Sequence, residues 1–383
     1  MGYRKITADK IFDGNQFLQQ HVLVLNHEGR VEALIPADEA GEEVEKYNGI
    51  LTPGFINAHC HVELSHLKGK VTAGKGLIDF LMEVVENRTK YNEGKEEAIS
   101  AAVAEMQRNG IVGVGDICNT TDAINAKQQS AMQWHSFVEV LNFTDASLKQ
   151  RMTHFKTVRE AHTEAGLNAV LCGHAPYSVT AATWKAINKS TEGQVISVHN
   201  QETAAENDLF LTGNGDFDRF YNKLSLNLSP FPSIGQSSLQ TWLPHFTEGQ
   251  TILLVHNLFV NEEDIVFAKT HAAKHGLNLV YCLCPNANLY IENQLPPIDL
   301  LLQHQCTIVL GTDSYSSNYE LNMVSELKTL LEHFSQLTLE KVLQWITSNG
   351  AAAFDWSALG AFQKGKHPGV VLLQNDFSVE MIL

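Results

Sequence analysis

Residues that could bind a metal ion stand out in this chain because each of them ends or follows a short apolar segment. His59 and His61 are separated by one residue at the first of these segments, and His199, His256 and Asp313 mark three others. Side chains alternate along a β-strand, so the imidazoles of His59 and His61 would face the same way. Imidazole and carboxylate groups are suitable ligands for zinc or iron. The pattern therefore predicts a metal centre where the ends of these segments meet.

Each of these residues also has an ordinary structural interpretation. A single histidine at a strand end is more often a hydrogen-bonded residue of the core or surface, and Asp313 alone would suit a helix N-cap or a turn. The combination is the stronger observation, because four separate segment ends carry metal-binding groups. It favours one shared site over four unrelated structural roles.

The apolar segments predict the strands that would bring these residues together. From Pro53 onward, short apolar runs alternate with longer helical patterns, which is typical of βα units and a parallel sheet. The arrangement suits a (β/α)8 TIM-type barrel, in which the carboxyl ends of the strands meet at the face that carries active sites. The predicted strands cover residues 54–59, 111–116, 136–141, 169–173, 195–199, 252–256, 279–284 and 307–311. Helices are expected between them, among others at 96–108, 148–165, 181–189, 262–275 and 321–334.

Two regions lie outside this repeating pattern. Residues 1–52 alternate strand-like pieces with turns, and a strand-like run at 369–373 could rejoin them. We therefore expect a small, discontinuous β-sandwich domain from residues 1–52 and 355–383, and a barrel from residues 53–354. Residues 209–248 form a long excursion after the fifth strand, and such connections at a barrel mouth often serve as lids or substrate walls.

The composition is that of a globular protein with an acidic surface. Of the 383 residues, 44% are hydrophobic, and 43 acidic against 27 basic side chains give a formal net charge of −16. Such a surface repels nucleic acid and anionic membranes, so we expect neither as a partner. The six cysteines form no CxxC pair, which favours free thiols in a reducing cytoplasm.

Several short motifs resemble those of one known family. The stretch from Pro53 to His61 resembles the signature of the amidohydrolase superfamily. Four more motifs are similar to those of the branch that deaminates purines and related rings, at residues 174–178, 198–202, 284–288 and 311–313. The resemblance spans nearly the whole chain. It implies the same barrel and a hydrolysis that replaces an exocyclic ring amino group by oxygen and releases ammonia.

The resemblance also implies roles for individual residues. One divalent metal ion, zinc first and iron as the alternative, would have the ligands His59, His61, His199 and Asp313. Asp313 would also accept a proton from the attacking water, and Glu202 would shuttle protons to the ring. His256 would orient the water and stabilise developing charge, and His174 would reach the substrate.

The end of the fourth predicted strand favours one metal ion rather than two. Two-metal members of the superfamily commonly carry a bridging carboxylated lysine there, whereas this chain has His174 and no lysine nearby. A non-catalytic binding protein is a further hypothesis. It is disfavoured because such proteins tend to lose metal ligands, and here all the ligands and Glu202 are present.

The substrate is the least determined part of the prediction. Residues 61–65 and 85–88 resemble aminodeoxyfutalosine deaminases more than methylthioadenosine/adenosylhomocysteine deaminases. We expect a small purine-like partner, an adenine-type nucleoside such as aminodeoxyfutalosine. The alternatives are methylthioadenosine, adenosylhomocysteine or guanine deamination, or ring-amide hydrolysis as in imidazolonepropionases. For the assembly of the protein, we consider a homodimer.

Two further residues are candidates for substrate binding. Arg88, together with Lys68 or Lys70, could bind a carboxylate on the substrate through charge-assisted hydrogen bonds. Glu63 would point like His59 and His61 if the first strand continued, and could then touch the substrate. Solvent exposure of Arg88 and a structural salt bridge of Glu63 are the ordinary alternatives.

Overall fold

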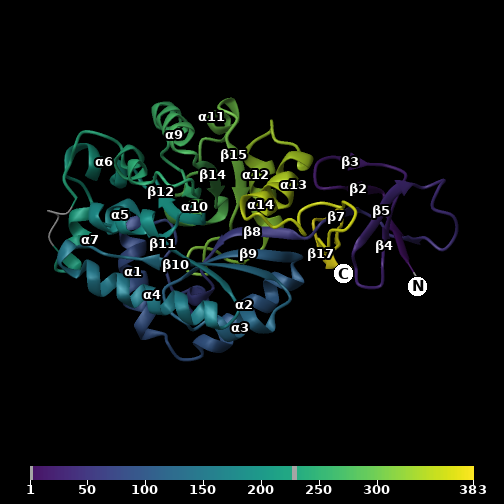
Figure 1. Cartoon of the computed structure of the whole chain (residues 1–383), viewed down its shortest axis with the longest axis horizontal. Coiled ribbons are helices and arrows are strands. Elements are labelled where there is room, and N and C mark those ends of the chain that lie inside the picture. Colours follow the sequence, from purple (N-terminus) through teal and green to yellow (C-terminus); the bar gives the residue numbers. More distant parts are fainter. Residues whose placement is uncertain (1–2, 227–230) are drawn as a thin grey trace.

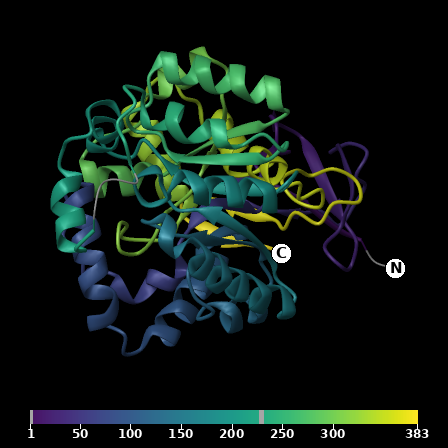
Figure 2. The same cartoon turned by 60° about the vertical axis from the view of Figure 1, so that its left-hand side comes forward.

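A barrel of parallel strands surrounded by helices forms the centre of the molecule, and a small β-unit extends from one end of it (Figures 1 and 2). The computed structural model describes residues 3–226 and 231–383. All six cysteines lie within these residues and are free thiols. No helix of the described residues is long and apolar enough to cross a membrane.

The barrel strands confirm the predicted runs. One parallel sheet has the order β11-β10-β9-β8 and another has the order β12-β13-β14-β15. Their bounds are β8 (Phe55–Cys60), β9 (Ile111–Cys118), β10 (Gln133–Val140), β11 (Asn168–Gly173), β12 (Val195–Asn200), β13 (Thr251–His256), β14 (Asn278–Leu283) and β15 (Thr307–Leu310). β8 is buried along its whole length, as expected for a parallel strand with both faces covered.

Backbone hydrogen bonds at two seams close the two sheets into a barrel. The amides of Thr312 and Asp313 both donate to the carbonyl oxygen of His59 at 3.0 Å, which joins the end of β15 to β8. The amide of His199 donates to the carbonyl oxygen of His174 at 2.9 Å, which joins β12 to the end of β11. A Cβ atom on Gly311 would lie 2.7 Å from the His59 carbonyl oxygen, so the first seam requires glycine there. Both seams run through predicted site residues, so closing the barrel also fixes their positions.

The helices around the barrel include all those predicted from the sequence. These are α2 (Lys95–Arg108), α4 (Leu148–Glu164), α5 (Ala181–Ser190), α9 (Glu262–His275) and α12 (Met323–His333). In α9, Asn261 accepts a hydrogen bond from the amide of Asp264 at the first turn, and Gly276 ends the helix in the left-handed conformation. Other helices are α1 (Leu77–Lys90), α3 (Ile124–Gln129), α10 (Pro285–Glu292), α11 (Ile298–Gln303), α13 (Leu339–Ile346) and α14 (Ser348–Ala353).

The excursion at 209–248 is more helical than the sequence suggested. It contains the end of α6 (Ala204–Thr212), α7 (Phe217–Lys223) and α8 (Ser238–Trp242), while residues 227–230 of the excursion lie outside the described residues. Such short helices show little periodicity in a sequence, because their stability comes from packing. Here α7 packs against α1, and its aromatic side chains belong to an apolar cluster with Leu77 and Phe80 of α1.

The small β-unit draws its strands from both ends of the chain. One sheet contains β1 (Arg4–Thr7), β4 (His21–Leu25), β5 (Val31–Pro36) and β6 (Glu45–Lys46). The other contains β2 (Lys10–Phe12), β3 (Phe17–Leu18), β7 (Ile50–Thr52), β16 (Val371–Leu373) and β17 (Val379–Met381). Apolar residues of both sheets share one buried cluster, and β16 pairs antiparallel with β7. The predicted return of the C-terminal strand to the N-terminal unit is confirmed, and the domain boundaries at 52/53 and 354/355 stay a prediction.

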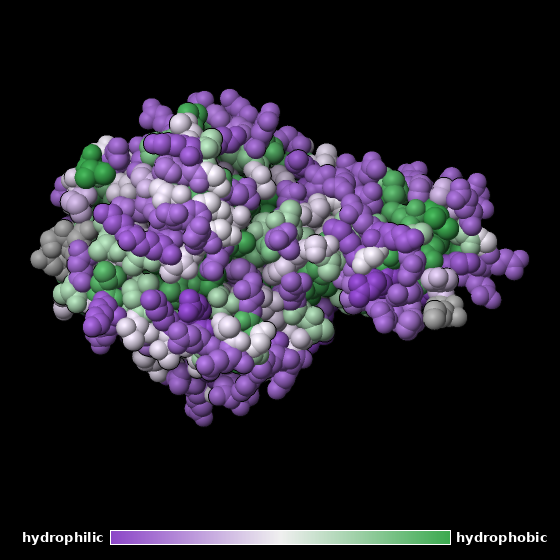
Figure 3. Space-filling model, viewed as in Figure 1, coloured by the Kyte–Doolittle hydropathy of each residue, from purple (hydrophilic) through white to green (hydrophobic). Residues whose placement is uncertain are grey.

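Hydrophilic residues cover most of the surface seen in Figure 3, over the barrel as well as over the narrower β-unit.

Candidate active site

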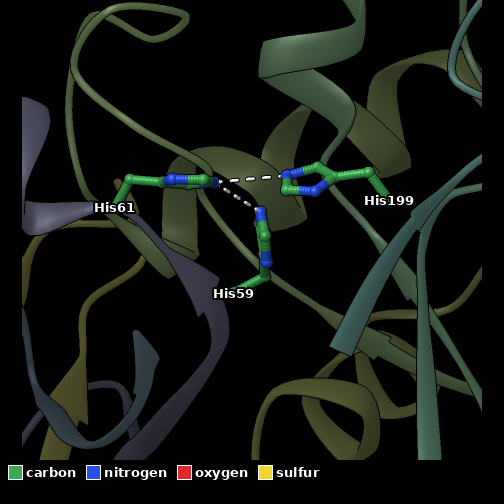
Figure 4. Close-up of side chains that lie close together, drawn as sticks. All are labelled: His59, His61 and His199. Atoms are coloured by element: carbon green, nitrogen blue, oxygen red, sulfur yellow. Dashed lines mark hydrogen bonds between the residues drawn. The ribbon is translucent and has the colours of Figure 1, made fainter. Parts of the chain in front are cut away.

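The imidazoles of His59, His61 and His199 converge at the mouth of the barrel (Figure 4). The Nε2 atom of His61 lies 3.2 Å from Nε2 of His59 and 3.3 Å from Nε2 of His199. Ligand atoms that each lie about 2.0–2.1 Å from one tetrahedral zinc ion are about 3.3–3.4 Å apart. The spacing of the three nitrogens therefore fits a single ion held between them.

Asp313 adds an acidic group to this cluster. Its Oδ1 atom lies 3.4 Å from Nε2 of His61 and 3.7 Å from Nε2 of His59, and its Oδ2 atom accepts a hydrogen bond from Ser317 Oγ at 2.6 Å. Burial raises the pKa of Asp313, but the neighbouring imidazoles outweigh it and hold this pKa well below its ordinary value. Asp313 has a φ of +56°, a conformation that is uncommon for a residue other than glycine and persists only where the surrounding structure enforces it.

The surroundings of His61 and His199 favour their neutral forms. Burial lowers the pKa of His61 well below its ordinary value, and burial followed by the charge of His59 lowers the pKa of His199 to about 4. The Nδ1 atom of His199 lies 2.9 Å from the carbonyl oxygen of His174, to which it can donate. That hydrogen bond leaves the Nε2 lone pair free for a metal ion, the arrangement usual for ligating histidines.

Glu202 and His256 form a second pair beside this cluster. Both side chains are buried, and Nε2 of His256 lies 3.4 Å from Oε1 of Glu202. Burial, followed by the charges of Asp313 and Glu206, raises the pKa of Glu202 well above its ordinary value, which favours its acid form. Asn288 Nδ2 lies 3.2 Å from Nδ1 of His256, an arrangement in which Nδ1 accepts the hydrogen bond and an Nε2–H would face Glu202. Two proton-bearing groups therefore stand next to the predicted metal ligands.

Glu206 holds the turn that carries Glu202, a feature not identified from the sequence. Its carboxylate accepts hydrogen bonds from the amide of Gln201 at 2.9 Å and from the amide of Glu202 at 3.4 Å, and Ser238 of α8 donates to it. Gln201 has a φ of +49°, so the chain turns sharply here. Glu206 therefore stabilises the backbone conformation that directs Glu202 toward the cavity.

A cavity of about 140 Å³ opens above these groups. His61, His199, His256, Glu202 and Asp313 all contribute to its lining. The other walls are largely apolar and come from α1 and from neighbouring segments, with the residues Leu64, Leu77, Phe80, Leu81, Val84, Val85, Leu141, Phe143, Tyr177 and Phe220. Phe220 belongs to α7, so the excursion at 209–248 supplies part of a wall. The cavity combines a polar floor with an apolar mouth, as is common for small-molecule sites.

The profile of one family, described as the amidohydrolase family, matches residues 50–382 of this chain. The chain belongs to the amidohydrolase family. It is therefore a hydrolase that acts on carbon–nitrogen bonds.

This amidohydrolase has relatives among characterised proteins. It is 28% identical over 313 residues to an adenosine deaminase of Helicobacter pylori, covering 80% of this chain and 74% of the relative. It is 28% identical over 290 residues to an aminodeoxyfutalosine deaminase of Nitratiruptor sp., covering 74% of this chain and 68% of the relative.

Two solved structures have a similar fold, and each can be superposed on 97% of this chain. The aminofutalosine deaminase of Helicobacter pylori in complex with methylthio-coformycin has a TM-score of 0.82 at 23% identity, covering 97% of this chain and 92% of that chain. An adenosine deaminase from Xanthomonas campestris with bound zinc has a TM-score of 0.69 at 20% identity, covering 97% of this chain and 84% of that chain. At these identities the likeness establishes the fold, including the barrel and the small terminal sheets.

His174 and Arg88 are the predicted substrate-binding residues that line the cavity of this amidohydrolase. Nδ1 of His174 lies 2.6 Å from Ser178 Oγ, and burial lowers the pKa of His174 to about 3, so its ring is neutral. One guanidinium nitrogen of Arg88 lies 3.8 Å from Glu63 and another donates to Asn119 Oδ1 at 3.4 Å. Arg88 therefore borders the cavity while resting on the loop after β9.

The side chain of Glu63 does not face the cavity, unlike the substrate-binding role considered from the sequence. β8 ends at Cys60 and the 3-10 helix η1 (Val62–Leu67) begins soon after, so the alternation that orients His59 and His61 does not extend to Glu63. Its carboxylate accepts hydrogen bonds from the amides of Asn119 and Thr120, both at 3.0 Å, and among the described residues it is not part of the cavity lining. Glu63 anchors a loop.

Lys68 and Lys70, the two lysines considered together with Arg88, do not contact the cavity. The Nζ atom of Lys68 lies 3.9 Å above the centre of the Tyr315 ring, and Nζ of Lys70 lies 5.2 Å from that of Tyr91. Neither lysine belongs to the lining formed by the described residues. Of the basic side chains named for substrate binding, Arg88 alone borders this cavity in the described part of the chain.

Glu139 is a cavity residue that the sequence analysis missed. It is the penultimate residue of β10 and 3% exposed, and it belongs to a second group with metal-like spacing, together with His174 and His199. The available signal was an acidic residue near the carboxyl end of an otherwise apolar predicted strand.

Proposed function

We propose that this amidohydrolase is a metal-dependent deaminase of adenine-type nucleosides. The observation that carries the proposal is the position of Glu202, which is buried 3.4 Å from His256 and lines the same cavity as His61, His199 and Asp313. Deamination of a ring needs a proton donor for a ring nitrogen in addition to a water nucleophile, and Glu202 meets that need. The relatives named adenosine and aminodeoxyfutalosine deaminases support the same activity.

We expect one divalent ion per chain, with the ligands His59, His61, His199 and Asp313. Zinc is the first candidate, since the similar deaminase from Xanthomonas campestris has bound zinc, and iron is the alternative. When bound, such an ion supplies a water that is nucleophilic near neutral pH. The group of Glu139, His174 and His199 is a weaker candidate for a second ion, because Nδ1 of His199 is engaged with the His174 carbonyl oxygen.

The side chains of the site account for the proton transfers of a deamination. Asp313 takes a proton from the water, and Glu202 gives its proton to a ring nitrogen, which makes the amino-bearing carbon more electrophilic. The Nε2–H of His256 donates to the oxygen as the new C–O bond forms. Asp313 then returns its proton to the amino group, and the C–N bond breaks to release ammonia. Glu202 takes up the proton of the added hydroxyl group, so that the ring carbonyl forms and both side chains regain their starting states.

We propose further that the substrate is a nucleoside with a bulky substituent, such as aminodeoxyfutalosine. The apolar walls contributed by α1 and Phe220 line the same cavity as the polar residues and suit a substituent on the base. Arg88 borders the same cavity and would bind a carboxylate on that substituent. Methylthioadenosine and adenosylhomocysteine are the alternative substrates.

Ammonia release from a panel of substrates tests the proposed function. The panel holds aminodeoxyfutalosine, methylthioadenosine, adenosylhomocysteine, adenosine, adenine and guanine. We expect kcat/KM for the best nucleoside to exceed that for either free base by at least about tenfold, because only the nucleosides fill the apolar walls. In a matched control, Arg88→Met should lower kcat/KM for aminodeoxyfutalosine more than for methylthioadenosine, which has no carboxylate.

Each outcome of this panel has a distinct consequence. A preference for adenine or guanine would refute the nucleoside substrate and leave the deaminase activity standing. Ammonia from none of the six compounds, together with hydrolysis of an imidazolone ring amide, would refute the deaminase proposal itself.

A further inference from the structure

Only one of the two carboxylate oxygens of Glu139 has a hydrogen-bond partner among the described residues. Its Oε2 atom accepts a hydrogen bond from Asn119 Nδ2 at 3.1 Å. Its Oε1 atom is buried and has no hydrogen-bond partner among the described residues, although Glu139 lines the cavity. Burying a carboxylate oxygen without a partner is costly, so such groups in native proteins call for an explanation.

His199 does not supply the missing partner. Its Nδ1 atom lies 3.5 Å from Oε1 of Glu139 but 2.9 Å from the carbonyl oxygen of His174. An imidazole that gives Nε2 to a metal ion keeps a single N–H, on Nδ1. The shorter contact with the carbonyl oxygen uses that N–H, so Oε1 lacks a donor among the described residues while its side chain lines the cavity.

Asn119, which is itself held by two hydrogen bonds, fixes the orientation of the Glu139 side chain. The amide of Asn119 donates to Glu63 at 3.0 Å, and the side-chain oxygen of Asn119 accepts from Arg88 at 3.4 Å. The side-chain nitrogen of Asn119 is thereby directed at Oε2 of Glu139. An acceptor held in this way, on a strand rather than on a loop, is preorganised for one ligand group.

The chemistry of the proposed substrates limits what that group can be. The exocyclic amino group of an adenine nucleoside leaves as ammonia, so it cannot hold the nucleoside in place throughout the reaction. The ring nitrogens of an N9-substituted adenine carry no hydrogen. The hydrogen-bond donors that remain on a simple adenine nucleoside are therefore the hydroxyl groups of its sugar.

We propose that Glu139 is a substrate-binding residue whose Oε1 atom accepts a hydrogen bond from a sugar hydroxyl group of the nucleoside. The inference rests on the proposed deamination of adenine-type nucleosides and adds the residue that distinguishes a ribose from a deoxyribose. His174 lies on the same side of the cavity, with a ligand atom within 4.8 Å of one from Glu139. Its neutral ring is a second polar contact for the same sugar.

The test compares adenosine, 2′-deoxyadenosine and 3′-deoxyadenosine in the zinc-loaded wild type, Glu139→Ala and Glu139→Gln, with ammonia release and bound zinc both measured. A hydrogen bond to a charged group contributes roughly 1.5–3 kcal/mol, so the wild type should prefer adenosine to one of the deoxy analogues by about 10- to 100-fold in kcat/KM. Glu139→Ala should reduce that preference to within about twofold and retain its zinc. Glu139→Gln keeps the volume of the side chain, and we expect a preference between those of the other two proteins.

The outcomes separate this inference from the function on which it rests. If Glu139→Ala lowers kcat/KM for all three nucleosides by the same factor, or loses zinc, Glu139 supports His199 and does not bind the sugar. If the wild type does not discriminate among the three nucleosides, the hydroxyl contact is likewise refuted. If the zinc-loaded wild type deaminates no nucleoside, the proposed function fails and this inference fails with it.

Discussion

Replacing Glu202 by glutamine is expected to lower kcat by at least about a hundredfold while the metal ion stays bound. General acid–base catalysis contributes roughly 10²- to 10⁴-fold, and a glutamine cannot carry the proton. The substitution keeps the volume of the side chain, and Glu206 continues to hold the turn through backbone amides rather than through the side chain of residue 202. Steady-state ammonia release and metal analysis on the same preparation provide the measurement.

The pH dependence of the two proteins adds a second observable for Glu202. Because the pKa of Glu202 is raised well above its ordinary value, the acid form is present at lower pH and is lost as pH rises through this pKa. Activity of the wild type should therefore fall on the alkaline side, and Glu202→Gln should lack that limb. Glu160→Gln, an exposed site, is the matched control. Activity of Glu202→Gln close to that of the wild type would show that Glu202 is not the proton donor.

Loss of the metal ion and of activity together is expected for His61→Ala, for Asp313→Ala and most fully for the double variant. His61 is central to the cluster, because its Nε2 atom lies within 3.4 Å of ligand atoms from His59, His199 and Asp313. A site with three protein ligands and an added water binds zinc more weakly than one with four, and the loss of two ligands leaves only a pair. Bound metal should fall from about one ion per chain to below about 0.1 in the double variant, with activity at least about a thousandfold lower.

Metal analysis after desalting and circular dichroism would check this expectation. His27→Ala, an exposed histidine of the small β-unit, is the control and should keep both metal and activity. Stoichiometric metal in the double variant would contradict the assignment of His61 and Asp313 as ligands. The folded fraction measured by circular dichroism separates that outcome from simple unfolding.

The sequence predicts the barrel and the convergence of its polar residues well because both follow from local rules. Apolar runs bounded by turns predict the strands, and the carboxyl ends of parallel strands must meet at one face of a barrel. His59, His199 and Asp313 therefore lie together, although they are far apart in the chain. The motifs that resemble the amidohydrolase family are those same strand ends.

The rest of the site depends on contacts that leave no local pattern. Glu139 and Glu206 look like ordinary acidic residues, and their importance arises from hydrogen bonds to Asn119 and Ser238, 20 and 32 residues away in the chain. The helices α1 and α7 form cavity walls through apolar residues that a sequence cannot distinguish from core residues. The sequence left two roles open for Glu63, because its orientation depends on where β8 ends, and strand ends are the least predictable part of an element. The structure has the structural role, with Glu63 near Arg88 rather than in the cavity lining.

Titration of the metal-free protein with zinc, while ammonia release from an adenine nucleoside is followed, tests the account most directly. The protein is first treated with a chelator and desalted, so that activity starts near zero. We predict that activity rises in proportion to added zinc, reaches its plateau at one equivalent per chain, and produces one ammonia for each oxo product. Full activity without added metal, or a plateau that needs two equivalents, would contradict a single ion bound by His59, His61, His199 and Asp313.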